Sequence, residues 1–129
     1  MTEISKYTIL VVDDNDDVRR LVRKILEKAG HDVVEGTSGD EALSITKELT
    51  PDLVLMDVRL PGSYDGMETT KILKEDPRLS VVPVIALTAS VLEKDQRRAM
   101  EAGCSGFISK PINIASLNKL VEKYIPIRS

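Results

Sequence analysis

The sequence predicts an α/β protein with a doubly wound parallel sheet, built from five strand–helix units. Short apolar runs rich in β-branched residues alternate with stretches of helical periodicity along the 129 residues. The apolar runs are nearly continuous, which is typical of strands covered by helices on both faces. The chain has the length of one domain, and the five units use almost all of it. We therefore expect a single domain over residues 1–129, with no output domain.

The predicted strands are short and separated by helix-length segments. They span 8–12, 32–35, 52–56, 81–87 and 106–109, of which 32–35 has the weakest pattern. Four consecutive apolar residues occur at 9–12 and again at 53–56, as expected for strands buried on both sides. Parallel strands need crossover connections, and right-handed crossovers place helices on both faces of an open sheet.

The first predicted helix has the clearest pattern, an apolar stripe at i, i+3 and i+4 spacing that ends at Gly30. The stripe consists of Val18, Leu21, Val22, Ile25, Leu26 and Ala29. Two further helices, near 42–49 and 114–124, end before prolines, which disfavour helical backbone in the residue before them. The remaining predicted helices, with less regular patterns, span about 66–74 and 91–102.

Composition excludes several classes of function. The net charge is −3 and the chain has no Trp, three Tyr and one Phe, so it lacks both the basic surface and the aromatic platforms of nucleic-acid binders. No apolar run approaches the roughly 20 residues that cross a bilayer, and the N-terminus has no signal-peptide pattern. Cys104 is the only cysteine, which excludes an intramolecular disulfide and fits a reducing compartment. We expect a cytoplasmic protein without direct nucleic-acid binding or membrane insertion.

A few single residues receive structural interpretations. We expect His31 to be a solvated turn residue and Cys104 to fill space before the last strand. We expect Met56, Met67 and Met100 to lie in the core.

Polar side chains follow four of the five predicted strands. Asp13 and Asp14 follow the first, Asp57 the third, Thr88 the fourth and Lys110 the fifth. Taken singly, each has an ordinary explanation as a helix cap, a turn residue or a solvated side chain. Ligands of open α/β sheets bind beyond the carboxyl ends of the strands, so together these residues indicate a site.

Three carboxylates at one edge of a sheet repel one another unless a cation lies among them. The absence of His and Cys nearby, and the small number of carboxylates, favour Mg²⁺. In such a site Asp57 can attack a phosphoryl group, with Lys110 and Thr88 binding its oxygens. Neither G-x-x-x-x-G-K-[ST] nor G-x-G-x-x-G is present, so a nucleotide site is not the competing explanation.

Over nearly its full length the chain resembles the receiver domains of two-component response regulators, in particular the single-domain chemotaxis-regulator type. Five separated motifs carry the resemblance: Val11-Val12-Asp13-Asp14-Asn15, Leu55-Met56-Asp57, Leu60-Pro61 with Asp65-Gly66, Leu87-Thr88-Ala89, and Ser109-Lys110-Pro111. The resemblance implies a flavodoxin-like (βα)5 sheet in strand order 2-1-3-4-5. It also implies a cis peptide between Lys110 and Pro111.

The resemblance further implies the role of each site residue. Asp57 is the expected phosphoacceptor, assisted by Lys110 and Thr88. Asp14 and Asp57 are expected to ligate Mg²⁺, or Mn²⁺ in its place, directly. Asp13 is expected to hold the ion through water, and the backbone carbonyl of Arg59 is the third protein ligand.

The implied partners are proteins. A sensor histidine kinase or a histidine-phosphotransfer protein would supply the phosphoryl group. Thr88 and the aromatic Phe107 would then switch the face formed by the helix near 91–102, the strand at 106–109 and the helix at 114–124, to which a downstream effector binds. The expected state is a monomer or a dimer induced by phosphorylation.

The chain departs from the family pattern in two places. The loop from Pro61 to Gly66 is one residue longer than usual, and Phe107 replaces the more common Tyr. Arg59 and Ser90 occupy the positions expected to tune dephosphorylation, with Arg59 long enough to shield the phosphoryl group from water.

Three alternatives remain open at this point. The chain can be a receiver module taken from a hybrid histidine kinase. It can be an aspartyl-phosphate phosphohydrolase of the haloacid dehalogenase kind, although that family has a second Asp where this chain has Arg59. It can also be a receiver-like scaffold without phosphorylation, against which the complete set of acidic residues, Thr88 and Lys110 argues.

Overall fold

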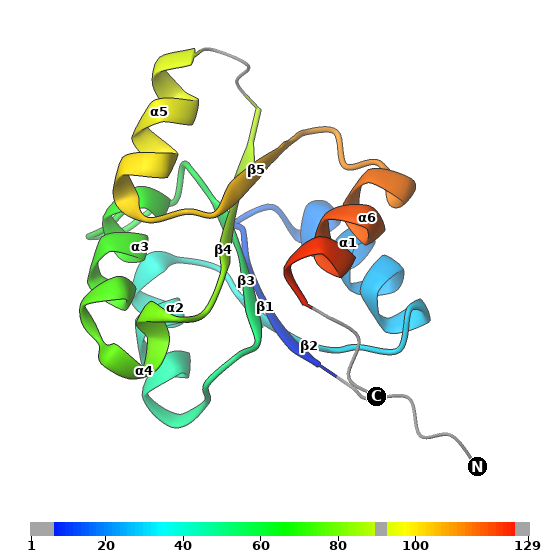
Figure 1. Cartoon of the computed structure of the whole chain (residues 1–129), viewed down its shortest axis with the longest axis horizontal. Helices are drawn as coiled ribbons and strands as arrows, with labels where there is room; N and C mark the ends of the chain where they lie inside the picture. The colour runs from blue at the N-terminus through cyan, green and yellow to red at the C-terminus, as the bar shows by residue number, and fades with distance from the viewer. Residues whose placement is uncertain (1–6, 90–92, 126–129) are drawn as a thin grey trace.

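A computed structural model describes residues 7–89 and 93–125, in which five parallel strands form one sheet between two layers of helices (Figure 1). The strands lie in the order β2-β1-β3-β4-β5. They are β1 (Thr8–Val12), β2 (Asp32–Gly36), β3 (Leu53–Asp57), β4 (Val84–Thr88) and β5 (Gly106–Ser109). The doubly wound, flavodoxin-like fold and its strand order are thus confirmed.

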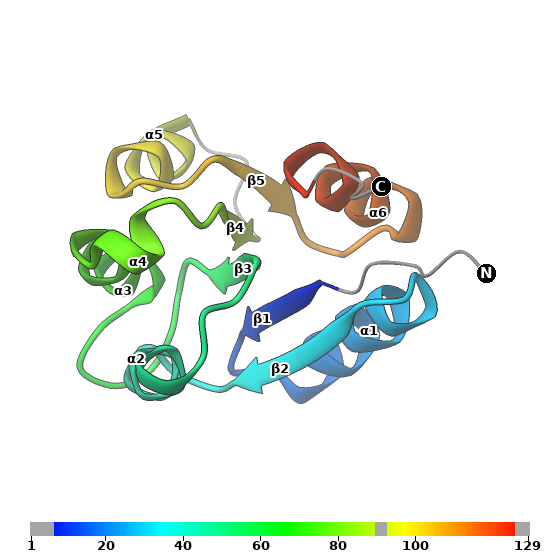
Figure 2. The same cartoon turned by 60° about the horizontal axis from the view of Figure 1, so that its bottom comes forward.

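Helices cover both faces of the sheet (Figures 1 and 2). On one face lie α1 (Asp16–Lys28) and α6 (Ile114–Tyr124). The other face is covered by α2 (Gly39–Glu48), α3 (Gly66–Glu75), the short α4 (Pro77–Ser80) and α5 (Glu93–Ala102). In the described part of the chain, no helix is both long enough and apolar enough to span a membrane.

Alternate strand residues enter the two halves of the core. In β1, Ile9 and Val11 pack toward α1 and α6, whereas Leu10 and Val12 pack toward α2, α3 and α5. All four side chains are completely buried. Burial of an aliphatic side chain of this size contributes about 1.5–3 kcal/mol to the free energy of folding. The continuous apolar runs of the sequence therefore reflect a sheet that has no solvent-facing side.

The region before β4 differs from the sequence-based expectation. The strand predicted at 81–87 begins only at Val84, and the preceding residues include a helix of one turn, α4. Asp76 caps this helix, its carboxylate accepting from the Arg78 N–H, and Pro77 occupies the first turn, where a missing N–H costs nothing. Val81 follows the helix and is 81% exposed, which excludes it from the sheet.

Three of the single-residue interpretations are confirmed and two are wrong. Met56, Met67 and Cys104 are buried, but Met100 is half exposed because it lies on the outer side of α5. His31 is half-buried rather than solvated, with its ring centroid 5.8 Å from that of Tyr7. Burial lowers the pKa of His31.

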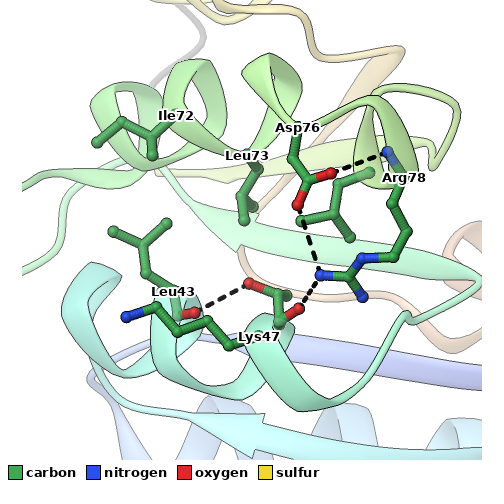
Figure 3. A pocket seen from close by; sticks show the side chains of 8 residues that line it. Leu43, Lys47, Ile72, Leu73, Asp76 and Arg78 are labelled. Carbon is green, nitrogen blue, oxygen red and sulfur yellow. Dashed lines mark hydrogen bonds and ion pairs between the residues drawn. The ribbon is translucent and has the colours of Figure 1, made fainter.

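Arg78 links α4 to α2 beside a pocket of about 270 Å³ (Figure 3). Its guanidinium donates to the backbone carbonyl of Thr46 and the hydroxyl of Thr50, and lies 3.5 Å from Oδ2 of Asp76. The residues around the pocket are Leu43, Thr46, Lys47, Ile72, Leu73, Asp76, Arg78 and Leu79, none of which belongs to the predicted site.

Candidate functional site

Three carboxylates meet at the carboxyl edge of the sheet. Asp13 and Asp14 follow β1, Asp57 ends β3, and the two strands are neighbours with Val12 paired to Met56. One carboxylate oxygen of each aspartate lies within 4.8 Å of the others. The structure thus brings together the acidic residues that the sequence places 44 positions apart, from Asp13 to Asp57.

Lys110 completes this cluster from the end of β5, an edge strand of the sheet. It follows β5, and its backbone N–H donates to the Thr88 carbonyl at 2.8 Å. The Lys110–Pro111 peptide is cis, as the resemblance implies. The ammonium Nζ lies 2.7 Å from Oδ2 of Asp13 and 3.4 Å from Oδ2 of Asp57. One cation of the protein therefore bridges two of the three carboxylates.

The aspartates differ strongly in burial. Asp13 is completely buried, Asp57 is nearly so, and Asp14 is exposed. Burial, and then repulsion by Asp13, raises the pKa of Asp57 to about 6, although Lys110 and the Arg59 N–H act against the shift. Burial alone would lower the pKa of Lys110, but its contacts with Asp13 and Asp57 raise it overall. At neutral pH Asp57 is therefore mostly ionised beside a charged Lys110 ammonium.

The turn after β1 fixes Asp13 while leaving Asp14 available. The Asp13 N–H donates to the Gly36 carbonyl at 3.1 Å, and its Oδ1 accepts from the Asn15 N–H at 2.9 Å. Asn15, rather than either aspartate, caps α1 through the N–H groups of Asp17 and Val18. Helix capping therefore does not account for the aspartate pair.

Thr88 and Phe107 lie on adjacent strands at the far side of the site. Thr88 ends β4 and is buried, while Phe107 in β5 is 37% exposed. In the register Ala86 pairs with Phe107 and Thr88 with Ser109, so all four side chains are on the same face of the sheet. The residue beside Phe107 on the neighbouring strand is therefore Ala86, which has a small side chain.

Arg59 has an exposed side chain, and its backbone N–H donates to Oδ1 of Asp57 at 3.2 Å. Ser90 lies outside the described residues. The lengthened loop between Arg59 and α3 contains Gly62, whose φ of +95° favours glycine, and its Ser63 N–H donates to Oδ2 of Asp40 at 3.4 Å. The extra residue is accommodated in a turn held against α2.

Two contributors to the site are not among the residues predicted to form it. A Cβ on Gly66 would lie 1.7 Å from the carbonyl oxygen of Asp57, so only glycine lets α3 begin directly against the end of β3. The Asp65-Gly66 pair in the sequence is the signal for it. Arg19 of α1 donates to the Asp13 carbonyl, and no periodicity or motif identifies this contact.

The donor set fits a hard divalent cation. The atoms that converge are carboxylate oxygens, and the exposed Asp14 leaves one side open to water. The raised pKa of Asp57 reflects the same crowding of negative charge, which a cation would relieve. Asp13, Asp14 and Asp57 are thus able to hold Mg²⁺ with positions left for other ligands.

Residues 9–122 match the model of the response regulator receiver domain. The chain therefore belongs to the response regulator receiver domain family, a class of regulatory modules in two-component signalling. A curated relative is the polar-differentiation response regulator DivK of Brucella ovis. It is 38% identical over 118 residues, which are 92% of this chain and 95% of the relative.

Solved structures agree with this assignment. The chemotaxis response regulator CheY4 of Vibrio cholerae has a TM-score of 0.89 and 26% identity, covering 94% of this chain and 100% of that one. The receiver domain of the sensor histidine kinase PA1611 from Pseudomonas aeruginosa has a TM-score of 0.86 and 29% identity, covering 93% and 98%. That structure holds a magnesium ion in its active site cleft.

Proposed function

We propose that this receiver domain accepts a phosphoryl group on Asp57 from a phosphohistidine of a sensor histidine kinase or a histidine-phosphotransfer protein. The observation that carries the proposal is the position of the Asp57 carboxylate. It lies at a strand end within 4.8 Å of two further aspartates and 3.4 Å from the Lys110 ammonium. Family membership and the likeness to DivK support this reading.

Asp14 and Asp57 are the proposed direct ligands of Mg²⁺, or of Mn²⁺ in its place. Asp13, which is buried and already bonded to Lys110, holds the ion through water, and the Arg59 carbonyl supplies the third protein ligand. When bound, the ion neutralises negative charge on the carboxylates and on the phosphoryl oxygens. The magnesium ion in the Pseudomonas aeruginosa receiver domain supports the choice of metal.

The transfer is a substitution at phosphorus. An oxygen of Asp57, ionised at neutral pH, forms the new O–P bond as the P–N bond to the donor imidazole breaks. The electron pair of that bond stays on the imidazole nitrogen, which the donor protein protonates. Lys110 keeps its proton and pairs with one phosphoryl oxygen, while the Thr88 hydroxyl donates to another.

The proposed output is a change of protein-binding surface. Movement of Thr88 toward the phosphoryl group frees space beside Ala86 that Phe107 enters, which alters the face formed by α5, β5 and α6. Two large apolar side chains, Met100 and Phe107, are exposed on α5 and β5. A downstream protein docks on this face, with the receiver as a monomer or as a dimer induced by phosphorylation.

The lifetime of the phosphorylated state is proposed to depend on Arg59 and Ser90. The long, exposed Arg59 side chain starts two residues from Asp57 and lies over the phosphoryl group, where it excludes the attacking water.

The same chemistry would serve a receiver module within a hybrid histidine kinase, and the likeness to the Pseudomonas aeruginosa kinase receiver favours that as the second setting.

The test is the intact mass of the protein after incubation with a small acyl phosphate. We expect one phosphoryl group on the wild type in Mg²⁺, and none in excess chelator or on Asp57→Asn. Asp17→Asn is the matched control, because it makes the same substitution at an aspartate in the first turn of α1. Among the ion pairs of the described residues, Asp17 pairs only with Arg20. Modification of Asp57→Asn, or equal modification without metal, would refute the assignment.

A further inference from the structure

We propose that Arg19 is a positioning residue for the acidic site, acting through the backbone of Asp13 rather than on the cation or the phosphoryl group. The juxtaposition that carries this is the Arg19 side chain, which is 11% exposed and whose Nη1 donates to the Asp13 carbonyl oxygen at 2.6 Å. The inference rests on the proposed function, since it concerns the carboxylates assigned there to Mg²⁺.

The guanidinium is held by three separate acceptors. Besides the Asp13 carbonyl, Nε donates to Oε1 of Glu35 at 3.0 Å and Nη2 donates to Asp16. Glu35 is in β2 and Asp16 is at the start of α1, so the planar fork of Arg19 joins β2, α1 and the turn after β1. A guanidinium directs its donors in fixed directions, which makes it suited to setting the distance between elements.

Asp13 is consequently held at four points. Its carbonyl accepts from Arg19, its N–H donates to Gly36, its Oδ1 accepts from Asn15, and its Oδ2 pairs with Lys110. Of these, the Arg19 contact is the one that ties the carbonyl side of the turn to a rigid helix. Asp14 follows this carbonyl directly, so the same contact orients the exposed carboxylate that would ligate the metal.

The charge of Arg19 is met by Glu35 and Asp16, and within residues 7–89 and 93–125 none of its hydrogen bonds or ion pairs reaches a carboxylate of the site. Loss of the side chain should therefore act on the spacing of Asp13 and Asp14. Residues that orient metal ligands from the next layer commonly change metal affinity by about 10–100-fold when replaced.

Arg23 provides a matched control on the same helix. It pairs with the other oxygen of Glu35 and with Glu27, and it donates to the Val33 carbonyl at 3.3 Å. Among the interactions of the described residues it has none with Asp13. Arg23→Gln removes the same charge and the same Glu35 partner as Arg19→Gln, but it leaves the turn after β1 in place.

The experiment is a calorimetric Mg²⁺ titration of the full chain in the wild type, Arg19→Gln and Arg23→Gln. We expect Arg19→Gln to weaken Mg²⁺ binding by about 10-fold, and Arg23→Gln to stay within about twofold of the wild type. Equal affinity of Arg19→Gln and wild type would overturn the inference while leaving the proposed function intact. So would an equal loss in both variants, which would trace the effect to Glu35. A wild type that binds no Mg²⁺ would overturn the proposed function itself.

A second readout separates positioning from catalysis. At saturating Mg²⁺ the rate of phosphorylation by a small acyl phosphate should return to the wild-type value in Arg19→Gln. A reduced rate with unchanged affinity would contradict the inference. If Arg19→Gln does not fold, Arg19→Lys and Arg23→Lys replace the pair, because lysine keeps the charge but loses the fork. Only the former should then bind Mg²⁺ less tightly, and equal affinities of the two would overturn the inference.

Discussion

Arg98 of α5 forms an ion pair with Asp65, the N-cap of α3, with Nη2 at 2.5 Å from Oδ2. Asp65 ends the loop that follows Asp57, whereas α5 is the helix that follows Thr88. The ion pair thus connects the segment that follows Asp57 with the segment that follows Thr88. Burial acts to raise the pKa of Asp65, but hydrogen bonds from the Glu68 N–H and from Arg98 hold it below its ordinary value.

We predict that Asp65→Ala costs about 1–2 kcal/mol of unfolding free energy, because it removes both a helix cap and the ion pair. Arg98→Gln should cost only about 0.2–1 kcal/mol, since half-exposed ion pairs contribute little. Because the pKa of Asp65 is lowered by folding, its contribution is present above the ordinary pKa and disappears as the pH falls through the lowered value. Urea unfolding of the two single variants and the double variant at several pH values measures these free energies of unfolding. Equal losses in the two single variants would contradict the prediction.

Gly66→Ala should disrupt the site and the fold together. The added methyl would meet the Asp57 carbonyl oxygen at 1.7 Å, so α3 and the end of β3 must separate. We expect a large loss of stability and no phosphorylation of any folded fraction. Gly36→Ala is the control, because its methyl would lie 3.5 Å from Ile45, an ordinary contact. Thermal unfolding and intact mass measure the two effects, and a stable, phosphorylatable Gly66→Ala would be evidence against the close approach.

Asp57→Asn should stabilise the metal-free protein at neutral pH. Burial and repulsion by Asp13 raise the pKa of Asp57 to about 6, so ionising it costs more in the folded than in the unfolded chain. Below about pH 4 the carboxyl is protonated in both states and the gain vanishes, whereas above about pH 6 the gain is complete, at about 1–3 kcal/mol. Urea unfolding of wild type and Asp57→Asn in chelator at several pH values tests this. A gain independent of pH would speak against it.

Thr88→Ala should accept a phosphoryl group but fail to move Phe107. The buried hydroxyl is the proposed link between the phosphoryl oxygen and the strand pair β4–β5. Phe107 is the only phenylalanine, so its ring signals are unique in an NMR spectrum. They should change in the wild type with beryllium fluoride and Mg²⁺ but not in Thr88→Ala. Thr46→Ala is the control, since its buried hydroxyl bonds only carbonyls of its own helix among the described contacts. Movement of Phe107 in both variants would refute this link.

Arg59→Asn and Ser90→Glu should shorten the lifetime of phosphorylated Asp57. The first removes the side chain proposed to exclude water, and the second supplies a carboxylate able to orient it. Loss of the phosphoryl group over time, followed by intact mass, measures the rate. Arg20→Asn, on the exposed side of α1, is the control. If neither substitution nor the pair accelerates the loss, the shielding explanation is wrong.

Much of the fold follows from local sequence patterns. The runs at 9–12 and 53–56 could be assigned to strands because both sides of the sheet are buried. The convergence of Asp13, Asp57 and Lys110 followed from strand ends meeting at one edge. The site residues were therefore identifiable before any coordinates, whereas their ligand roles remain predictions.

The remainder depends on contacts that leave no pattern. The turn of helix at Pro77–Ser80 is too short to show a period, so the sequence pattern predicts a strand that begins three residues before β4 does. The hydrophobicity of Met100 predicts a core position, but hydrophobicity alone does not say which side of α5 faces the sheet, and Met100 is half exposed. Arg19 reaches Glu35 across 16 positions of sequence, and this contact exists only once α1 packs beside β2.

The position of Lys110 has a consequence for how the chain matures. During synthesis the three carboxylates, which follow β1 and end β3, emerge early, while the ammonium that bridges two of them follows β5, the last strand along the chain. Parallel sheets form by long-range pairing, so this final strand joins only a nearly complete domain. An unfinished or unfolded chain therefore presents acidic groups without their counter-charge, and the cluster bridged by Lys110 forms only together with the native fold.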